Sequence, residues 1–581
     1  MSNDAVDRYY SRRRFVKMAA LGAAAVPVGG AFLAACGNAT PTTEPATSAA
    51  AATTAASATT AAAATTAASA TTAAAATATT SYLKSPAPGV PDGYTTPPAP
   101  FKATSGIPGK GGTVRVFMIS YAAPPPPRSE NKYWQELEKR LGVKWEITLA
   151  PQNSYAEKLG VITAGGDLPE LTFLDTDLGF APEQYKTIQQ GAYTDLTSYL
   201  TGDGLKEFPN LALYPDQLWK NVAINGKIFG VPRPRYLVGS ANQYRKDWLE
   251  NLGISAPKNA DEFYSIMEAF TKKKPEPTQP NTWGMGFTQG EFSSQTVFMH
   301  MFRVPNTWKL ESNGSLSYFI EAPEYKEAVA FMAKLWKAGF IYPDSVSQSK
   351  QQSQDNFVAG KYGVWQDSLT GYPGPTGRHA TAAGINPKAN IVPYFPPGYD
   401  GGKPVSWLGS GYFGYAAIPS RVGKDPAKAK ELLSILNWLA SPFGSEEYNF
   451  YNFGVDGVDN EVKPDGTRVL NDTGKKEIGD LPKIANGNQV LYYPGFPEQP
   501  KIMQDTIQAM LAVGISNPAL TAVSPTWNTK SKVLTQLVED RIVRIVTGAD
   551  SIDALSTLIK DWKSQGGSQV AQELAAAIKG S

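Results

Sequence analysis

The segments TVRVFMIS (113–120), NKYWQELEKRL (131–141), VKWEITL (143–149), YAEKLGVIT (155–163) and LTFL (171–174) alternate between two hydrophobic patterns. The first, third and last are short runs rich in β-branched and aromatic residues, which predicts strands. The other two place apolar residues on one helical face, and Gly142 closes the first of them. This strand-helix-strand-helix-strand order predicts an α/β lobe with an open parallel sheet and helices on both faces.

Ligands of such sheets bind beyond the carboxyl ends of the strands. In this lobe those ends are Tyr121 and the turn Asp175-Thr176-Asp177. The sequence therefore predicts a binding edge that carries one aromatic ring and two carboxylates.

Several later segments, in the same order, resemble those of bacterial extracellular solute-binding proteins, family 1, which capture substrates for ABC importers of sugars. The segments are GGDLPE (165–170), NGKIFGVP (225–232), YRKDWL (244–249) with NLG (251–253), and FVAGKYGV (357–364). The ending, IVTG (545–548), LIKDWK (558–563) and GG (566–567), is similar to the LplA-like lipoproteins of that family. The resemblance runs from about residue 112 to 578.

This resemblance implies a two-lobe periplasmic-binding-protein-like fold of type II, with hinged lobes and an interlobe ligand cleft. Residues 109–240 plus about 409–500 would form the first lobe and 241–408 the second, with C-terminal helices in 501–581 packing across both. The segment GVDGVD (454–459) departs from the subgroup, where Glu and His are expected in place of Asp456 and Asp459. A shared ligand is therefore not implied.

The N-terminal residues read as an export signal. The twin-arginine run SRRRFVK (11–17) is followed by apolar residues and by Leu33-Ala34-Ala35-Cys36, which holds the only cysteine. Residues 1–35 are predicted to be a twin-arginine (Tat) lipoprotein signal peptide, with a lipid anchor on Cys36 in the membrane. The alternative is an N-terminal membrane helix, although Gly and Pro residues within the apolar segment disfavour it.

Residues 36–108 are predicted to be a disordered tether, because 46–80 contain only Ala, Thr and Ser and 86–100 are rich in Pro. Removal of residues 1–35 takes five basic and two acidic residues from totals of 54 and 52, which leaves a net charge of −1. A neutral protein lacks the basic excess that nucleic-acid binding needs. We expect no nucleic-acid partner, no cofactor, no metal and a monomeric chain.

Two charged or glycine-rich motifs have competing interpretations. The GxGxxG pattern from Gly409 to Gly414 could be a dinucleotide turn, but the residues that follow read as a strand, so a hinge crossing is favoured. Arg245 and Asp247 could bind substrate, whereas a structural role at the start of a second-lobe helix is favoured.

Sugar recognition needs aromatic faces for the rings and planar polar groups for the hydroxyls. Aromatics make up 11% of the chain, which fits either large cores or such a stacking surface. The candidate ligand residues, chosen at strand ends and around the predicted hinges, are Tyr121, Asp175, Asp177, Tyr236, Asn242, Trp365, Asp367, Trp407, Tyr412 and Trp527. Among maltose-binding relatives, positions resembling Asp175 and Trp527 contact sugar. For each residue taken singly, core packing or a surface ion pair is the alternative.

Catalytic motifs are scarce. The chain has two histidines, and its one cysteine is the predicted lipidation site, so a Cys/His nucleophile pair or a zinc cluster is not available. The leading hypothesis is a non-enzymatic, lipid-anchored extracellular binding protein that captures an oligosaccharide and delivers it to ABC transporter permease subunits. The alternatives are a lipid-anchored glycoside hydrolase or lyase acting on polysaccharide, a surface scaffold, and a binder of another solute such as a peptide.

Overall fold

The first of two main sheets has five strands, in the order β4 (Lys144–Pro151), β3 (Thr113–Ser120), β5 (Leu171–Asp175), β14 (Tyr412–Ala417) and β6 (Gly230–Pro234). In this computed structural model β3 lies parallel to both β4 and β5. The sequence predicted a parallel sheet, and β14 is the exception because it runs antiparallel to both of its neighbours. It returns from far along the chain, so its direction is not set by a local crossover.

The structure describes residues 81–175 and 182–579. The predicted signal peptide, Cys36, the tract up to residue 80 and Asp177 lie outside this range. Within it, no helix combines the length and the apolar character needed to cross a lipid bilayer.

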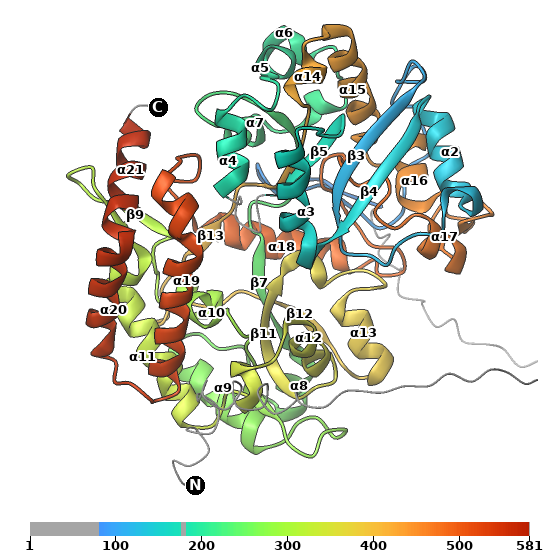
Figure 1. Ribbon diagram of the computed structural model, residues 1–581. Helices are drawn as coiled ribbons and strands as arrows, with labels where there is room; N and C mark the ends of the chain where they lie inside the picture. Colours follow the sequence, from blue (N-terminus) through green and yellow to red (C-terminus); the bar gives the residue numbers. More distant parts are fainter. Residues whose placement is uncertain (1–80, 176–181, 580–581) are drawn as a thin grey trace, which may run out of the picture. The chain divides into compact units, whose positions relative to one another are not determined.

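Two helices connect the first three strands and confirm the local prediction. In α2 (Lys132–Leu141) the Asn131 side chain accepts a hydrogen bond from the backbone N–H of Trp134, and Gly142 ends the helix with a φ of 70°. The second helix, α3 (Gln152–Gly165), leads from β4 to β5. Because β4 and β5 flank β3 on opposite sides, right-handed crossovers place α2 and α3 on opposite faces of the sheet (Figure 1).

The second main sheet has the order β12 (Ile391–Tyr394), β7 (Ser240–Arg245), β11 (Tyr362–Ser368) and β8 (Trp283–Met285). Strand β7 is antiparallel to both β11 and β12, and β11 is parallel to β8. The segment 357–364, which resembles the family, therefore ends α12 (Lys350–Val358) and enters the central strand β11.

The other described elements surround these sheets. Beside the first sheet are α4 (Pro182–Gln189), α5 (Thr197–Leu200), α6 (Gly202–Leu205), α7 (Asp216–Val222), α14 (Ser420–Gly423), α15 (Pro426–Leu439), α16 (Glu446–Phe453), β15 (Asn460–Val462), β16 (Arg468–Leu470) and α17 (Asp472–Glu477). The residues that follow β7 supply α8 (Lys246–Leu252), α9 (Ala260–Lys272), α10 (Thr296–Met301), β9 (Trp308–Leu310), β10 (Leu316–Tyr318), α11 (Pro323–Lys337), α12 (Lys350–Val358) and α13 (Arg378–Ile385).

Short crossings join the two sheets. Residues 235–239 lead directly from β6 to β7. The return passes through β13 (Ser406–Leu408), which pairs in parallel with β18 (Gly514–Ser516) before the chain enters β14. The GxGxxG motif lies in this return, and its third glycine, Gly414, is inside a strand. It does not start a helix, which rules out the dinucleotide-turn interpretation.

The buried apolar residues form one cluster around the first main sheet and two clusters that include strands of the second. The third contains Val90, Tyr236 and Trp365, together with residues of α18 (Gln499–Leu511). The C-terminal helices α19 (Pro525–Val546), α20 (Ala554–Trp562) and α21 (Ser568–Lys579) contribute their buried residues to the cluster of the second sheet. Helix α19 packs on α11 and also touches α4, which follows the first sheet (Figure 1).

Part of the predicted tether is structured, which corrects that prediction. Strand β2 (Gly93–Tyr94) pairs with β1 (Tyr82–Leu83) and with β17 (Leu491–Tyr492). Nε2 of Gln504 donates to the backbone oxygens of Leu83 and Pro91, each at 3.0 Å, and the Glu447 carboxylate accepts hydrogen bonds from the backbone of residues 103 and 104. We call residues 82–104 the strap. Its prolines suggest a linker, but its backbone groups find partners on the folded body.

Candidate functional site

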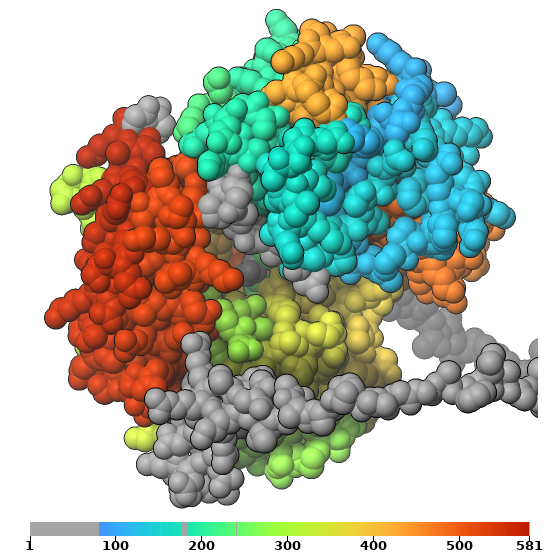
Figure 2. All heavy atoms as spheres, in the orientation of Figure 1, coloured from blue at the N-terminus to red at the C-terminus, as the bar shows by residue number. Residues whose placement is uncertain are grey.

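Corresponding edges of the two sheets lie at the ends of the 235–239 crossing. At the first edge β3 and β5 end at Ser120 and Asp175, and β14 begins with Tyr412. At the second edge β7 begins and β11 ends, since Ser240 is paired with Ser368. Five residues reach at most about 18 Å, so the two edges lie close together. Figure 2 shows a recess between the cyan residues of the first sheet and the yellow residues of the second.

Tyr121 is the exposed aromatic residue of the first edge. Tyr121 is 55% exposed, and its ring centroid lies 5.9 Å from that of buried Phe413. Its backbone N–H donates to Oδ2 of Asp480 at 2.9 Å, which fixes the loop after β3. Asp175 is buried at the end of β5, and both Asp175 and Tyr121 lie near enough to Tyr155 to help burial raise the pKa of that phenol.

Two arginines missed by the sequence reasoning also lie at this edge. The Cζ atoms of Arg235 and Arg233 lie 3.9 and 5.4 Å from the centroid of the Phe413 ring. Their spacing of two residues along an extended chain places them on the same side. The alternating segment Pro232-Arg233-Pro234-Arg235, directly after a family-like motif, was the signal that could have identified them.

At the second edge the structure brings Trp365 and Asp367 together on β11. The Asp367 carboxylate pairs with Arg378 and, at 3.0 Å, with Lys350. Nζ of Lys350 and Cζ of Arg378 lie 4.9 and 5.2 Å from the Trp365 ring. Because Trp365 is fully buried, it supports these two cations from below and does not present an open stacking face.

Asn242 and Tyr236 are buried near the same crossing. Asn242 lies on β7 and its Nδ2 donates to Oγ1 of Thr296 at 3.5 Å. Tyr236 bonds to Tyr493, and burial raises the pKa of Tyr236 to about 12. Tyr236 also lines a cavity of about 520 Å³ beneath the strap, together with Val90. Both side chains therefore act in packing around the crossing in this structure.

The remaining candidates lie further along the crossings. Nε1 of Trp407 donates to the Val304 oxygen at 2.8 Å, and Trp527 follows the cap Ser524 with its ring 6.2 Å from that of Tyr318. Both tryptophans are half-buried against the cluster of the second sheet. The Tyr412 hydroxyl donates to the backbone oxygen of Asn221 at 3.3 Å, so Tyr412 is held against the end of α7. These contacts, to Val304, Tyr318 and Asn221, do not link the three candidates to Tyr121 at the first sheet edge.

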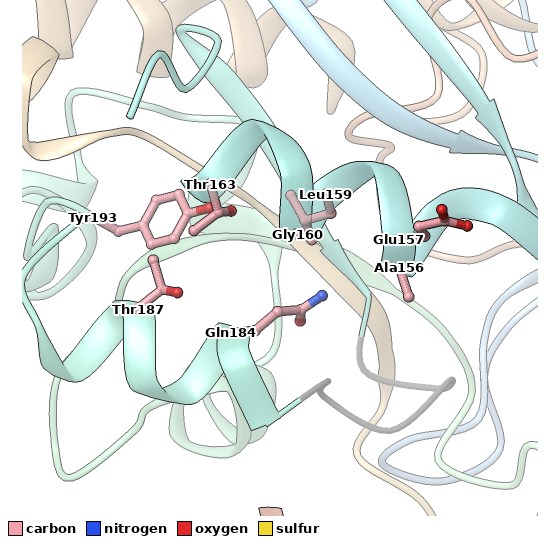
Figure 3. A pocket seen from close by; sticks show the side chains of 8 residues that line it. All are labelled: Ala156, Glu157, Leu159, Gly160, Thr163, Gln184, Thr187 and Tyr193. Carbon is pink, nitrogen blue, oxygen red and sulfur yellow. The ribbon is translucent and has the colours of Figure 1, made fainter. Parts of the chain in front are cut away.

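A cavity of about 390 Å³ opens between α3 and α4 in the first lobe (Figure 3). Its polar lining includes Thr163, Gln184, Thr187 and Tyr193, which come from those helices and the turn after α4. The predicted ligand residues do not line it. We therefore place the candidate site at the two sheet edges.

The described residues contain no cluster of three or more His, Cys, Asp or Glu placed to hold a metal ion. In the divergent loop, Oδ2 of Asp459 accepts from the Val455 N–H at 2.7 Å, and Asp456 pairs with Arg468 at 2.8 Å. These acids stabilise their own loop.

Trp407 is linked to a buried histidine that should make stability depend on pH. Nε2 of His300 accepts a hydrogen bond from the Trp407 N–H at 3.1 Å, and burial lowers the pKa of His300 to about 3. Below about pH 6.5 the unfolded chain binds a proton that the folded chain excludes, so acidification destabilises the fold.

We expect this histidine to cost about 2 kcal/mol of unfolding free energy between pH 7 and pH 5. Urea denaturation at both values, on the original chain and on His300→Gln, measures the difference. The variant should lose less stability on acidification. An equal loss in both proteins would show that His300 is not held neutral.

The chain resembles known proteins over most of its length. Residues 123–444 match the family described as bacterial extracellular solute-binding protein. Two Bacillus subtilis (strain 168) proteins are similar: lipoprotein LipO, 26% identical over 80% of this chain and 92% of that protein, and the polygalacturonan/rhamnogalacturonan-binding protein YtcQ, 27% identical over 80% and 90%.

Solved structures show the same fold. An extracellular solute-binding protein from Bifidobacterium longum subsp. infantis has a TM-score of 0.61 at 16% identity, and the match covers 82% of this chain and 99% of that one. The S. pneumoniae substrate-binding protein FusA, in complex with kestose, has a TM-score of 0.60 at 16% identity, with 80% and 99% covered. The fold is thus the predicted two-lobe fold of solute-binding proteins, and the chain belongs to the bacterial extracellular solute-binding protein family.

Proposed function

We propose that this chain captures an oligosaccharide between its two lobes and delivers it to the permease of an ABC importer. The observation that carries this proposal is the pairing of an exposed ring, Tyr121, with guanidinium and carboxylate groups at two sheet edges joined by short crossings. Aromatic faces and planar polar groups are what sugar rings and their hydroxyls require. YtcQ is named as a polygalacturonan/rhamnogalacturonan-binding protein, and FusA was solved in complex with kestose. Both support a saccharide as the ligand.

The lobes close on the ligand in this proposal, and the crossings at 235–239 and 409–411 act as hinges. The first lobe would comprise residues 109–240 and about 409–500, and the second 241–408. In this proposal the permease recognises the closed form of the protein. Small-angle scattering should show a smaller radius of gyration when the ligand is added, and an unchanged radius would contradict closure.

The chain acts as a binding protein and not as an enzyme in this proposal. Incubation with a panel of oligosaccharides, followed by tryptophan fluorescence and product analysis, tests it. A saturable fluorescence change with intact saccharide supports binding alone. Turnover would instead support the hydrolase or lyase alternative.

We further propose that the protein is monomeric and is anchored by lipid on Cys36 at the extracytoplasmic face of the membrane, after twin-arginine export. The ordered motif of twin arginines, apolar segment and Leu-Ala-Ala-Cys supports this proposal. Cys36→Ala should move the protein from the membrane fraction to the soluble fraction. A Cys36→Ala protein that stays in the membrane fraction would favour a membrane helix.

A further inference from the structure

Arg233 lacks the ion pair that most arginines of the described residues form. Ten arginines of the described chain form an ion pair with a described carboxylate, whereas Arg233 forms none. Its Nε donates to Oδ1 of Asn486 at 3.2 Å, and within residues 81–175 and 182–579 no acceptor is bonded to its two Nη groups. Arg233 is half-buried, and burial together with nearby Arg235 lowers its pKa.

Asp480 is the carboxylate whose charge acts on Arg233, and its oxygens already have hydrogen-bond and ion-pair partners. Asp480 accepts hydrogen bonds from Oγ of Ser120 at 2.8 Å and from the backbone N–H groups of Tyr121 and Ala122, and it pairs with Lys483 at 3.2 Å. Arg233 and Arg235 both lie against one ring, Phe413. An anion bound at the two Nη groups of Arg233 would offset the loss of hydration that burial imposes on this guanidinium.

The same ring connects these cations to the exposed stacking face. The Phe413 centroid lies 3.9 Å from Cζ of Arg235 and 5.9 Å from the centroid of Tyr121. Cζ of Arg233 lies 5.4 Å from the same Phe413 centroid. A uronic acid carries its carboxylate on the carbon next to the sugar ring, so one residue can cover Tyr121 and still reach the Arg233 guanidinium. A guanidinium fork binds a carboxylate through two parallel hydrogen bonds, which a neutral hydroxymethyl group cannot match.

We propose that the site selects an acidic oligosaccharide, with Arg233 binding the carboxylate of a uronic acid residue whose ring stacks on Tyr121. This inference rests on the proposed function and narrows its ligand class. It assigns Arg233 as a specificity-determining residue. The neutral charge of the whole chain does not oppose it, because the selective charge is local.

Isothermal titration of the full chain with trigalacturonate, its methyl ester and maltotriose tests the inference. We expect trigalacturonate to bind at least tenfold more tightly than its methyl ester, since hydrogen bonds to charged groups are strong. Its affinity should fall as salt is raised. Equal affinity for the acid and the ester, or binding of maltotriose alone, would overturn the acidic class and leave the proposed function standing. Binding of none of these or of a wider saccharide panel would overturn the proposed function itself.

Arg233→Gln should raise the dissociation constant for trigalacturonate about tenfold or more and leave that for the methyl ester within about twofold. Arg140→Gln is the matched control, because Arg140 also lies over a phenylalanine, Phe450, at 4.2 Å but away from the sheet edges. It should bind trigalacturonate as the original chain does. If Arg233→Gln fails to fold, the acid and ester comparison on the original chain still decides. Tighter binding of a sulfated trisaccharide than of trigalacturonate would contradict the carboxylate assignment.

Discussion

Arg245→Met is expected to lower the free energy of unfolding by about 3 to 5 kcal/mol, because it leaves two carboxylates buried without their counter-ion. Nη2 of Arg245 lies 2.6 Å from both Oδ2 of Asp247 and Oε2 of Glu276. The Arg245 and Glu276 side chains are each 1% exposed. Arg245 carries the single positive charge against two negative ones, so its loss should be the most damaging change in this cluster.

Glu276→Gln should lower the free energy of unfolding by less than Arg245→Met does. Arg245 and Asp247 remain in that variant as an ion pair with no net charge. Burial opposes ionisation of Glu276, yet its hydrogen bond to Arg245 leaves its pKa below the usual value. Glu276 therefore contributes stability above about pH 4.5 that is lost as the pH falls. Urea denaturation at pH 7 and pH 4 should show a smaller difference between Arg245→Met and the original chain at the lower pH.

Arg541→Met is the control for this cluster. Its pair with Asp561 spans 3.4 Å and both side chains are more than a third exposed, so the loss should stay below about 1 kcal/mol. A small loss for Arg245→Met with a large loss of ligand binding would instead favour the substrate role for Arg245 and Asp247. The buried geometry supports the structural role.

Gly414→Ala is expected to destabilise the chain by about 2 to 4 kcal/mol and to weaken ligand binding. Gly414 has a φ of 145°, and an added Cβ would lie 2.5 Å from the backbone oxygen of Leu174 and 2.7 Å from the Phe173 ring. Strand β14 must shift to relieve these contacts. The shift would displace its neighbour Phe413, which supports Tyr121 and the two arginines.

Gly409→Ala offers a matched control from the same glycine motif. Its added Cβ would meet its nearest atom, the Leu237 oxygen, at an ordinary 3.5 Å, and the backbone there has no positive φ. We expect the free energy of unfolding to change by no more than about 0.5 kcal/mol. Equal effects of the two substitutions would show that the backbone at Gly414 is not restrictive.

The sequence predicted the elements whose signals are local. Residues 113–174 form the expected strands and helices because hydrophobic period, Asn131 as a cap and Gly142 as a stop all agree. The direction of β14 within the sheet was not predictable, since it depends on partners far away in the sequence. The strap was misread for a related reason: its prolines describe the local chain, whereas Gln504 and Glu447, which hold it, come from distant helices.

The candidate site was predicted in outline. Strand-end reasoning found Tyr121, Asp175 and Asp367, which lie at the two edges, but it had no means of telling that Trp365 is covered by Lys350 and Arg378. It also missed Arg233. An arginine in a strand normally has a carboxylate partner, and only the structure shows that Arg233 pairs with no described carboxylate. Burial and pairing are properties of the assembled fold.

The strap also determines how mechanical force enters the protein. If Cys36 is anchored, drag from flowing medium pulls on residue 82, and β1 is peeled from β2 before other elements bear load. Next in series come the Gln504 amide, bonded to Leu83 and Pro91, and then the Glu447 carboxylate. Under tension these bonds should break before the two lobes unfold. Detachment of the strap would then lengthen the tether, while both lobes and the solute between them stay intact.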